Sequence, residues 1–263
     1  IQLNFRGDKQ WVQQKSIEDL QALSEAFAFD LYIHPGFVVT PDDAEIAARA
    51  LEAEQVDLVL CQNTSFCSGY LIQRLARVNA AIGLWAVPET TETGPMPLNS
   101  FCGINLSAAI ITHYLKAYPI RYKWFYGYKE SDLLTERLRL TLDALRAVKN
   151  LRGSKVALVG GIAPGFDNFY DDERLIEQRF GVRVDRLVEF GDIERRANAY
   201  SEKELAPYIE SLVAEAAYVT DKGREGLVKY ARMHKAYEDL AKEGHYAAFA
   251  STSKPVSTIV MVF

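Results

Sequence analysis

The chain has 263 residues and a mass of 29.6 kDa, which exceeds one average domain and predicts one large unit or two smaller ones. Hydrophobic residues make up 49% and charged residues 25%, a balance that excludes a disordered chain. The net charge is −5 and basic residues alternate with acidic ones, which argues against nucleic acid or an anionic membrane as the main partner and favours a small molecule or another subunit.

Helical and extended patterns alternate almost from the start of the chain, which is typical of a parallel sheet covered by helices on both faces. Ser16–Phe27 is predicted to be a helix with Ser16 as its N-cap, because acids fill the first turn and apolar residues recur on one face. Leu31–Ile33 is predicted to be extended. A second helix is predicted from Thr40 to about Glu54, since Thr40 is followed by a proline and two acids.

Three short and nearly apolar runs then predict buried parallel strands: Val56–Cys61, Ile82–Val87 and Tyr122–Tyr126. Two predicted helices separate these strands: Tyr70–Asn79 and Gly103–Ala117. Leucines and a valine that recur at steps of three or four residues predict a further helix from Ser131 to Asn150. This helix closes a first Rossmann-like domain, residues 1–150.

A predicted strand over Lys155–Val159 opens a second domain, residues 151–263, which this chain need not contain in full. The patterns that follow predict three helices and two extended segments: Arg174–Phe180, Val182–Leu187, Ser201–Val219, Gly226–Glu243 and His245–Phe249, of which the second and the last are extended. Ser257–Phe263 fits either a final strand or a sequence altered by truncation or a shifted reading frame. The predicted fold class is therefore α/β, with two successive Rossmann-like, doubly wound domains and mainly parallel sheets.

A glycine-containing segment, Leu158–Phe166, stands where a phosphate-binding loop would follow a strand. Its glycines at 160 and 165 have Walker A spacing, but Phe166 and Asp167 replace the required lysine and hydroxyl residue, so a nucleoside triphosphate is not expected. The glycine spacing and a proline also break the dinucleotide pattern. Two interpretations stay open, a strand-end turn that needs backbone freedom and a loop that faces a ligand.

Polar side chains follow two of the predicted strands, Val56–Cys61 and Ile82–Val87. Others lie just before the predicted helix Gly103–Ala117. Because the carboxyl ends of parallel strands meet at one edge, where open α/β folds bind ligands, these groups are expected to line a common crevice. Amides and hydroxyls beside aromatic rings suit a polyol such as a sugar. The predicted substrate-binding residues are Gln62, Thr64, Phe66, Trp85, Glu89, Asn99, Cys102 and Asn105. In the competing structural interpretation, Asn99 and Ser100 only cap the helix and Cys102 is a small buried hydrophobe.

The residue spacing predicts no metal site made from this chain alone. The four histidines share no H-x-x-x-H or H-E-x-x-H spacing. Asp171, Asp172 and Glu173 offer ligands for a hard cation, but acids that open a helix ordinarily complement its dipole, and that interpretation is favoured. No catalytic residue can be assigned from spacing.

A cytoplasmic location is expected. The three cysteines fit neither a disulfide framework nor a zinc site, so reduced thiols are expected. No apolar stretch reaches the ~18–20 residues of a membrane span. Residues 1–30 also lack the layout of a signal peptide.

Five segments of the chain occur together in order: LWAVPE (84–89), LNSFCGIN (98–105), YKWFYG (122–127), TLDALRAVKNLRG (141–153) and GGIAPGFDNFYDDERL (160–175). Together they resemble the L-fucose/L-arabinose isomerase-like family of sugar isomerases, over roughly residues 55–250. The resemblance implies two successive Rossmann-like domains, a third C-terminal domain, and homo-oligomers in which the first domain leans over the active site of a neighbour.

The resemblance also implies aldose–ketose isomerisation with a divalent ion, commonly manganese. In that chemistry the ion polarises the oxygens of the open-chain sugar, while a carboxylate moves a proton between adjacent carbons through an ene-diol. In the family, two carboxylates and a histidine late in the second domain and in the third hold the ion. After HYAAFA (245–250) the family continues into a Cys-Trp-Pro segment, whereas this chain reads STSKPVSTIVMVF. No metal ligand is therefore carried over, and this chain alone is expected to be inactive.

Three functions remain in competition. The first is the N-terminal two-domain part of a metal-dependent sugar isomerase of carbohydrate metabolism. The second is a non-catalytic sugar-binding protein, and the third is a scaffold subunit without an active site. The identity of the sugar, the number of subunits and the course of the native chain beyond Phe263 are left open by the sequence.

Overall fold

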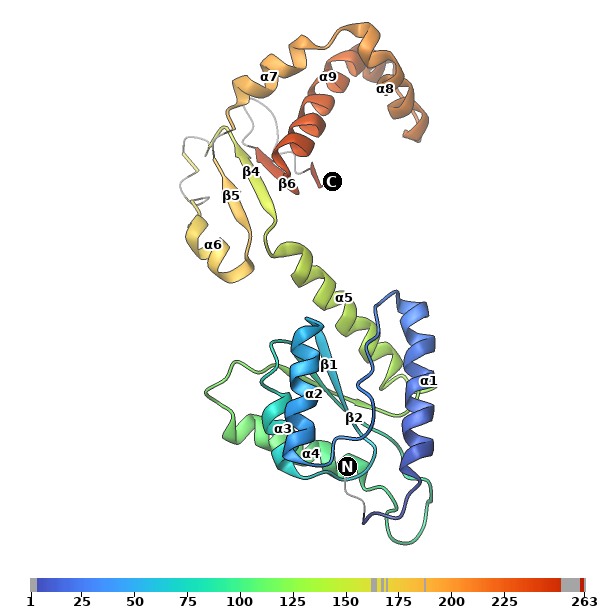
Figure 1. The fold of residues 1–263 in the computed structure, drawn as a ribbon. Coiled ribbons are helices and arrows are strands. Elements are labelled where there is room, and N and C mark those ends of the chain that lie inside the picture. The colour runs from blue at the N-terminus through green and yellow to red at the C-terminus, as the bar shows by residue number, and fades with distance from the viewer. Residues whose placement is uncertain are drawn as a thin grey trace. The chain divides into compact units, whose positions relative to one another are not determined.

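The computed structural model describes residues 4–161, 165–166, 168, 170–186, 188–251 and 261–262. The chain divides into two compact units, residues 1–145 and 146–263 (Figure 1). The division falls inside helix α5 (Thr135–Leu151), whereas the sequence patterns predict a boundary after residue 150. Each unit alternates parallel strands with helices, which confirms the predicted pair of Rossmann-like units.

The first unit is built on a parallel sheet whose described strands are β1 (Leu58–Asn63), β2 (Ala81–Ala86) and β3 (Tyr122–Tyr126). Its helices, apart from α5, are α1 (Lys9–Phe27), α2 (Pro41–Ala53), α3 (Gly69–Leu75) and α4 (Ser100–Tyr114). The strands are neighbours in chain order, and their carboxyl ends are level because Asn63 pairs with Ala86 and Ala86 pairs with Tyr126.

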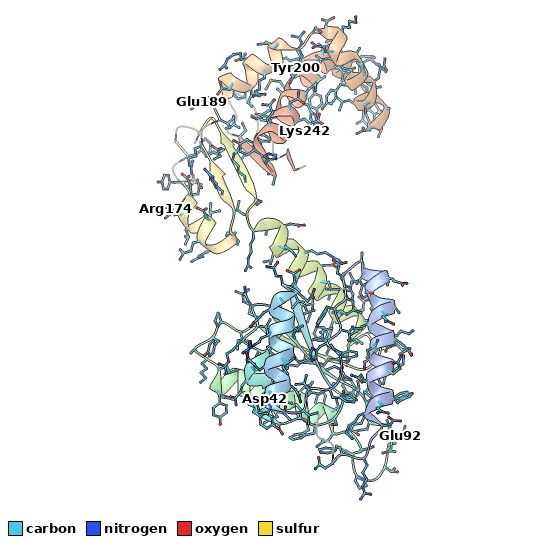
Figure 2. The ribbon with its side chains drawn as sticks, viewed as in Figure 1. Asp42, Glu92, Arg174, Glu189, Tyr200 and Lys242 are labelled. Carbon is cyan, nitrogen blue, oxygen red and sulfur yellow. The ribbon has the colours of Figure 1, made fainter. Side chains whose placement is uncertain are left out.

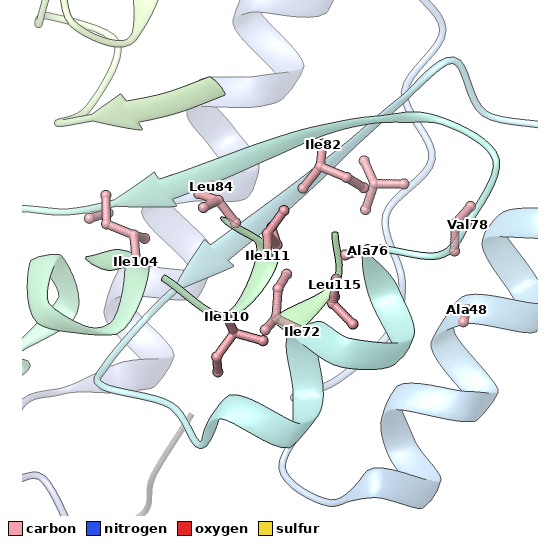
Figure 3. Close-up of a cluster of buried hydrophobic side chains, with 12 residues drawn as sticks. Ala48, Ile72, Ala76, Val78, Ile82, Leu84, Ile104, Ile110, Ile111 and Leu115 are labelled. Carbon is pink, nitrogen blue, oxygen red and sulfur yellow. The ribbon is translucent and has the colours of Figure 1, made fainter. Parts of the chain in front are cut away.

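Helices cover both faces of this sheet because each strand buries alternate side chains on opposite sides. On one face, α3 and α4 pack against Ile82 and Leu84 of β2 through a cluster of aliphatic side chains (Figure 3). On the other face, α1 and α5 pack against Trp85 and Phe125. Each fully buried side chain of this size contributes about 1.5–3 kcal/mol to stability, so the unit has a substantial core on both sides of the sheet.

The second unit has the described strands β4 (Lys155–Val159), β5 (Arg183–Asp185), β6 (Ala248–Ser251) and β7 (Met261–Val262). Its helices are α6 (Glu173–Phe180), α7 (Phe190–Ala199), α8 (Glu202–Glu215) and α9 (Asp221–Gly244). The sheet order is β5-β4-β6-β7, with the first three strands parallel and β7 antiparallel to β6. Ile193 of α7 and Tyr237 of α9 lie in one buried cluster with Phe249 of β6.

Several elements lie where local signals predict them. The strands β3 and β4 coincide with the predicted ranges residue for residue. Helix α2 begins behind the predicted cap, because Thr40 Oγ1 accepts a hydrogen bond from Asp43 N at 3.1 Å and the Asp43 carboxylate accepts one from Thr40 N at 2.8 Å. This reciprocal pair is a capping box, and it needs no tertiary contact to form.

The predicted start of α1 is wrong. The helix begins at Lys9, and Asp8 caps it by accepting a hydrogen bond from Trp11 N at 2.9 Å. Ser16 lies in the middle of the helix, where its buried hydroxyl donates to the Val12 carbonyl at 2.7 Å. A serine followed by acids resembles an N-cap, but a serine can also satisfy its hydroxyl on the preceding turn of a helix.

Leu31–Ile33, which is predicted to be extended, lies in no described helix or strand. Two further differences concern the second unit. His245 is the left-handed C-cap of α9, with φ of 51°, so β6 begins only at Ala248 and not at His245. Helix α7 was not predicted. Leu187 and most of the predicted final strand lie outside the described residues. Within the described part of the chain, none of the helices is both long enough and apolar enough to cross a membrane.

Candidate functional site at the carboxyl edge of the first sheet

The carboxyl edge of the first sheet brings the ends of β1, β2 and β3 against the first turn of α4. Asn63, Ala86 and Tyr126 are paired in one row across the sheet. Side chains in one row of a parallel sheet share a face, and the next row points the opposite way. This row therefore faces α3 and α4, in agreement with the packing of Ala86 and Tyr126 in that cluster.

The preceding row consists of Gln62, Trp85 and Phe125, and it faces α1 and α5. Trp85 is only 1% exposed, and its indole N–H donates to the Gly127 carbonyl at 2.9 Å. Gln62 also turns toward α1, where its Nε2 donates to Ser16 Oγ at 3.1 Å. The sheet therefore separates these two predicted substrate-binding residues from the side chains at the start of α4.

Thr64 belongs to the same hydrogen-bond network as Gln62. It is 3% exposed, and its hydroxyl donates to Gln62 Oε1 at 2.7 Å. Gln62 is itself held by Ser16, so the network joins the end of β1 to the middle of α1. In this unit the two predicted polyol-binding side chains satisfy each other.

Ser100 connects the first turn of α4 to the ends of β1 and β2. It is fully buried, its hydroxyl donates to the Asn63 carbonyl, and it accepts a hydrogen bond from Val87 N at 3.0 Å. One side chain thereby satisfies backbone groups just at and beyond the ends of β1 and β2. The first turn of α4 is consequently fixed in position against the sheet.

Glu89 fixes the segment that leads into α4. Its two carboxylate oxygens accept hydrogen bonds from Leu98 N at 2.8 Å and from Asn99 N at 2.7 Å. Asn99 is the N-cap residue, but it has φ of 52° and its side chain makes no capping hydrogen bond. The predicted position of Asn99 at the cap of this helix is confirmed, but its side chain does not supply the capping hydrogen bond. Its amide is not consumed by the helix.

Gly103 explains the glycine at this position of the sequence. A Cβ atom there would lie 2.5 Å from Asn63 Nδ2 and 3.3 Å from Phe66 Cα. Asn63 Nδ2 is held in place because it donates to Cys67 Sγ at 3.2 Å. Only glycine lets α4 approach the loop after β1 so closely.

The solvent-facing part of the edge is formed by the first turns of α4. Phe101, Cys102 and Asn105 are exposed, and Asn99 and Phe66 are half-buried. The Phe101 ring packs edge-on against Tyr126, with ring centroids 5.5 Å apart. Of the predicted substrate-binding residues, Cys102 and Asn105 are exposed, Phe66, Asn99, Gln62 and Glu89 are half-buried, and Thr64 and Trp85 are buried.

The exposure of Cys102 differs from the interpretation that this residue is a small buried hydrophobe. Cys102 is exposed, so its predicted alternative role as a buried hydrophobe is wrong. Cys67 is buried and Cys61 is partly buried. Burial raises the pKa of Cys61 to about 12 and also raises the pKa of Cys67, which makes both poor nucleophiles near neutral pH.

A buried carboxylate near this edge was not predicted as a site residue. Asp19 of α1 is 0% exposed, and it accepts hydrogen bonds from Lys15 Nζ at 2.6 Å and from Lys129 N at 3.0 Å. Burial, with a smaller contribution from the charge of Asp19, raises the pKa of Tyr128 to about 12. Asp19, Asn63 and Ser100 were not predicted as anchoring residues of the site, because nothing in their spacing distinguishes an anchor from a solvated polar residue.

The acids and the glycine-containing loop of the second unit were the other candidate ligand-binding features of the sequence. Asp172 is the N-cap of α6, where it accepts hydrogen bonds from Arg174 N and Leu175 N, and Glu173 lies in the first turn, so the favoured helix-end role is confirmed for these two acids. Asp171 instead forms an ion pair with Arg186 at 2.8 Å. Residues 162–164 of the glycine-containing loop lie outside the described residues. Throughout the described ranges, there is no group of three or more His, Cys, Asp or Glu side chains that could hold a metal ion.

Comparison with known proteins gives a distant similarity. No model of a known protein family matches the sequence. The chain is 24% identical over 177 residues to the sulfoquinovose isomerases of Priestia aryabhattai and of Priestia megaterium (strain ATCC 12872 / QMB1551). The matched region is 66% of this chain but 38% of each relative, so the chain spans well under half the length of the curated relatives that it matches. The chain is therefore distantly similar to sugar isomerases.

Proposed function

We propose that this chain forms part of an aldose–ketose isomerase of carbohydrate metabolism, within the L-fucose/L-arabinose isomerase-like group, and that a sugar binds at the carboxyl edge of its first sheet. The observation that carries the proposal is the similarity to two sulfoquinovose isomerases. The position of the polar side chains supports it, because open α/β units bind ligands at this edge.

Within the proposed site, the side chains have two kinds of role. Asn99 and Asn105 offer amides to sugar hydroxyls. The exposed ring of Phe101 and the half-buried ring of Phe66 offer an apolar surface to the sugar's C–H groups. Glu89 and Ser100 act as positioning residues, because their polar atoms already bind the backbone. Gln62, Thr64 and Trp85 support the edge from the side of α1.

A divalent ion, commonly manganese, belongs to the proposal through the family resemblance. Among the residues that the structure describes, no ligand group of three suitable side chains is present. The described residues therefore do not fit the ion, and no proton-transfer step is assigned to side chains of this chain. A homo-oligomer in the cytoplasm, in which other protein segments complete the site, is part of the same proposal.

The first test is proton exchange. The protein is incubated in D₂O with manganese and, in turn, sulfoquinovose, L-fucose and L-arabinose, and the C2 proton of each sugar is followed by NMR. An isomerase that works through an ene-diol exchanges this proton with solvent and forms the ketose. Absence of exchange for every sugar, with protein purified at full length from its source, would contradict the proposed activity.

The second test concerns binding at the proposed edge and does not need catalysis. Cys102 is exposed in the first turn of α4, so a bound sugar should slow its alkylation. A sugar present at ten times its Kd should also stabilise the fold by about 1.4 kcal/mol. Asn99→Ala should weaken both effects, whereas Asn79→Ala, at an exposed position before β2, should change neither. Equal protection and equal stabilisation in the two variants would contradict the proposed contact between the sugar and Asn99.

A further inference from the structure

The second unit contains a pocket between α8 and α9 that the proposed sugar site does not use. It has a volume of about 290 Å³ and is lined by Tyr208, Ser211, Leu212, Glu215, His234 and Glu238. The four residues from α8 follow the spacing of one helical face, and the two from α9 are four residues apart. The lining is therefore formed by two facing helix stripes.

These stripes are polar, although facing stripes of two packed helices are usually apolar. The Tyr208 hydroxyl is hydrogen-bonded to His234 Nδ1, and it also bonds to the Glu238 carboxylate. Glu238 is held in turn by Lys242 Nζ at 2.6 Å; Lys242 is labelled on α9 in Figure 2. Keeping polar groups at a helix interface costs free energy unless they are satisfied, and here three of them are already ordered by one another.

Glu215 makes the pocket acidic. Its carboxylate accepts a hydrogen bond from Ser211 Oγ at 3.1 Å, and no ion pair among the described side chains includes it. Lys242 forms an ion pair with Glu238. Lys235 is paired with Asp239 at 3.0 Å, and its ammonium group lies 5.9 Å from the centroid of the Tyr208 ring.

Aromatic surface accompanies the negative charge. The rings of Tyr208 and Tyr230 lie 5.8 Å and 5.7 Å from the His234 ring, centroid to centroid. A cation is attracted both by a carboxylate and by the face of a tyrosine ring. Leu212 adds an apolar patch that suits a short alkyl chain.

We propose that this pocket binds a small organic cation, a primary ammonium group on a short alkyl chain. The ammonium group would pair with Glu215, and the chain would lie against Leu212 and the Tyr208 ring. This site is separate from the proposed sugar site, so it stands or falls independently of the isomerase proposal.

The test uses putrescine as the cationic probe and 1,4-butanediol as its neutral isostere. Binding to the full 263-residue chain is followed by NMR through the imidazole signals of His234, assigned with a His234→Gln variant. Putrescine should shift these signals in a saturable way, and 1,4-butanediol should not. Glu215→Gln should weaken putrescine binding by about fivefold, as expected for the loss of one exposed charge pair.

The matched control is Glu210→Gln, which removes an exposed carboxylate from the same helix but outside the pocket. It should leave the affinity unchanged. Equal weakening by the two variants would show a general charge effect and overturn the proposal. An equal response to putrescine and to the diol would overturn the charge requirement, and no saturable shift at His234 would overturn the site.

Discussion

At the scale of single residues, the cluster at the carboxyl edge of the first sheet is held together by side chains that bind backbone groups. Ser100 and Glu89 each satisfy two backbone polar atoms. Gly103 leaves the space that Asn63 occupies. The residues that shape the proposed site are therefore partly different from those that face solvent in it.

Replacing Ser100 with alanine should destabilise the protein by about 2–4 kcal/mol, because Val87 N and the Asn63 carbonyl would both lose a buried partner. Urea unfolding followed by fluorescence measures this change. Ser24→Ala is the control, since its hydroxyl bonds the Gln21 carbonyl at an exposed position. A cost for Ser100→Ala no larger than that of Ser24→Ala would contradict the anchoring role.

Replacing Gly103 with alanine should also be destabilising. A helix gains about 1 kcal/mol from Gly→Ala, but the new Cβ would clash with the held Asn63 amide and press on the Phe66 backbone, which costs about 1–3 kcal/mol or more. Gly226→Ala in α9 is the matched comparison, since a Cβ there meets open space. The midpoint of thermal unfolding should fall for Gly103→Ala and rise for Gly226→Ala. A change in the same direction for both variants would contradict the close approach of α4 to Asn63 and Phe66.

At the scale of elements, end signals of helices proved more informative than their interiors. The capping boxes of α2 and α8 can be read from a short polar spacing, because every participant is local in sequence. Ser16 shows the limit of this reasoning. Its hydroxyl and the two acids that follow it match the pattern of an N-cap, yet the chain is helical on both sides of Ser16. Whether a serine begins a helix depends on the residues before it. Here those residues are already helical, because Asp8 caps the helix.

Asp43 should make the stability of the protein depend on pH. Hydrogen bonds from the Thr40 backbone, and then from the Val39 backbone, hold the pKa of Asp43 below its ordinary value of 3.8. A carboxyl with a lowered folded pKa stabilises the fold above its unfolded pKa, and that contribution disappears as the pH falls through the folded pKa.

Asp43→Asn should therefore lower the urea midpoint at pH 7, and the difference from the original protein should shrink steadily between pH 5 and pH 2. Asp42→Asn, one residue earlier in the same turn (Figure 2), should have the smaller effect. A difference that stays constant over this pH range would show that the cap does not depend on the charge of Asp43.

At the scale of the whole molecule, each of the two units contains buried hydrophobic clusters of its own. Phe125 is fully buried in the first unit between the sheet and α1, and Phe249 is 1% exposed in the second unit. These two residues belong to different clusters of described residues. Each unit therefore depends on its own core for stability.

Phe125→Ala and Phe249→Ala should each lower the free energy of unfolding by about 3–5 kcal/mol. Each substitution should destabilise only the unit that contains it. Hydrogen–deuterium exchange with mass spectrometry should show faster exchange in residues 1–145 for the first variant and in residues 146–263 for the second. Loss of protection throughout the chain in either variant would show that the two units unfold as one.

The sequence by itself determined the α/β class, the pair of Rossmann-like units and the position of strands such as β3 and β4. These features follow from short-range signals, namely apolar runs, helix spacing and caps, which lie close together in the chain. The sequence also directed attention to the carboxyl edge of the first sheet, because parallel strands bring their ends together.

Only the tertiary structure decided which side chains at that edge are accessible. Trp85 and Asn99 look equally suitable for a sugar in the sequence, yet the first is packed against α1 and α5 while the second keeps its amide free of the helix. The reason is that the direction and burial of a side chain depend on sheet register and on helices distant in sequence. A shift of one residue in a strand exchanges the two faces, and no local pattern records that choice.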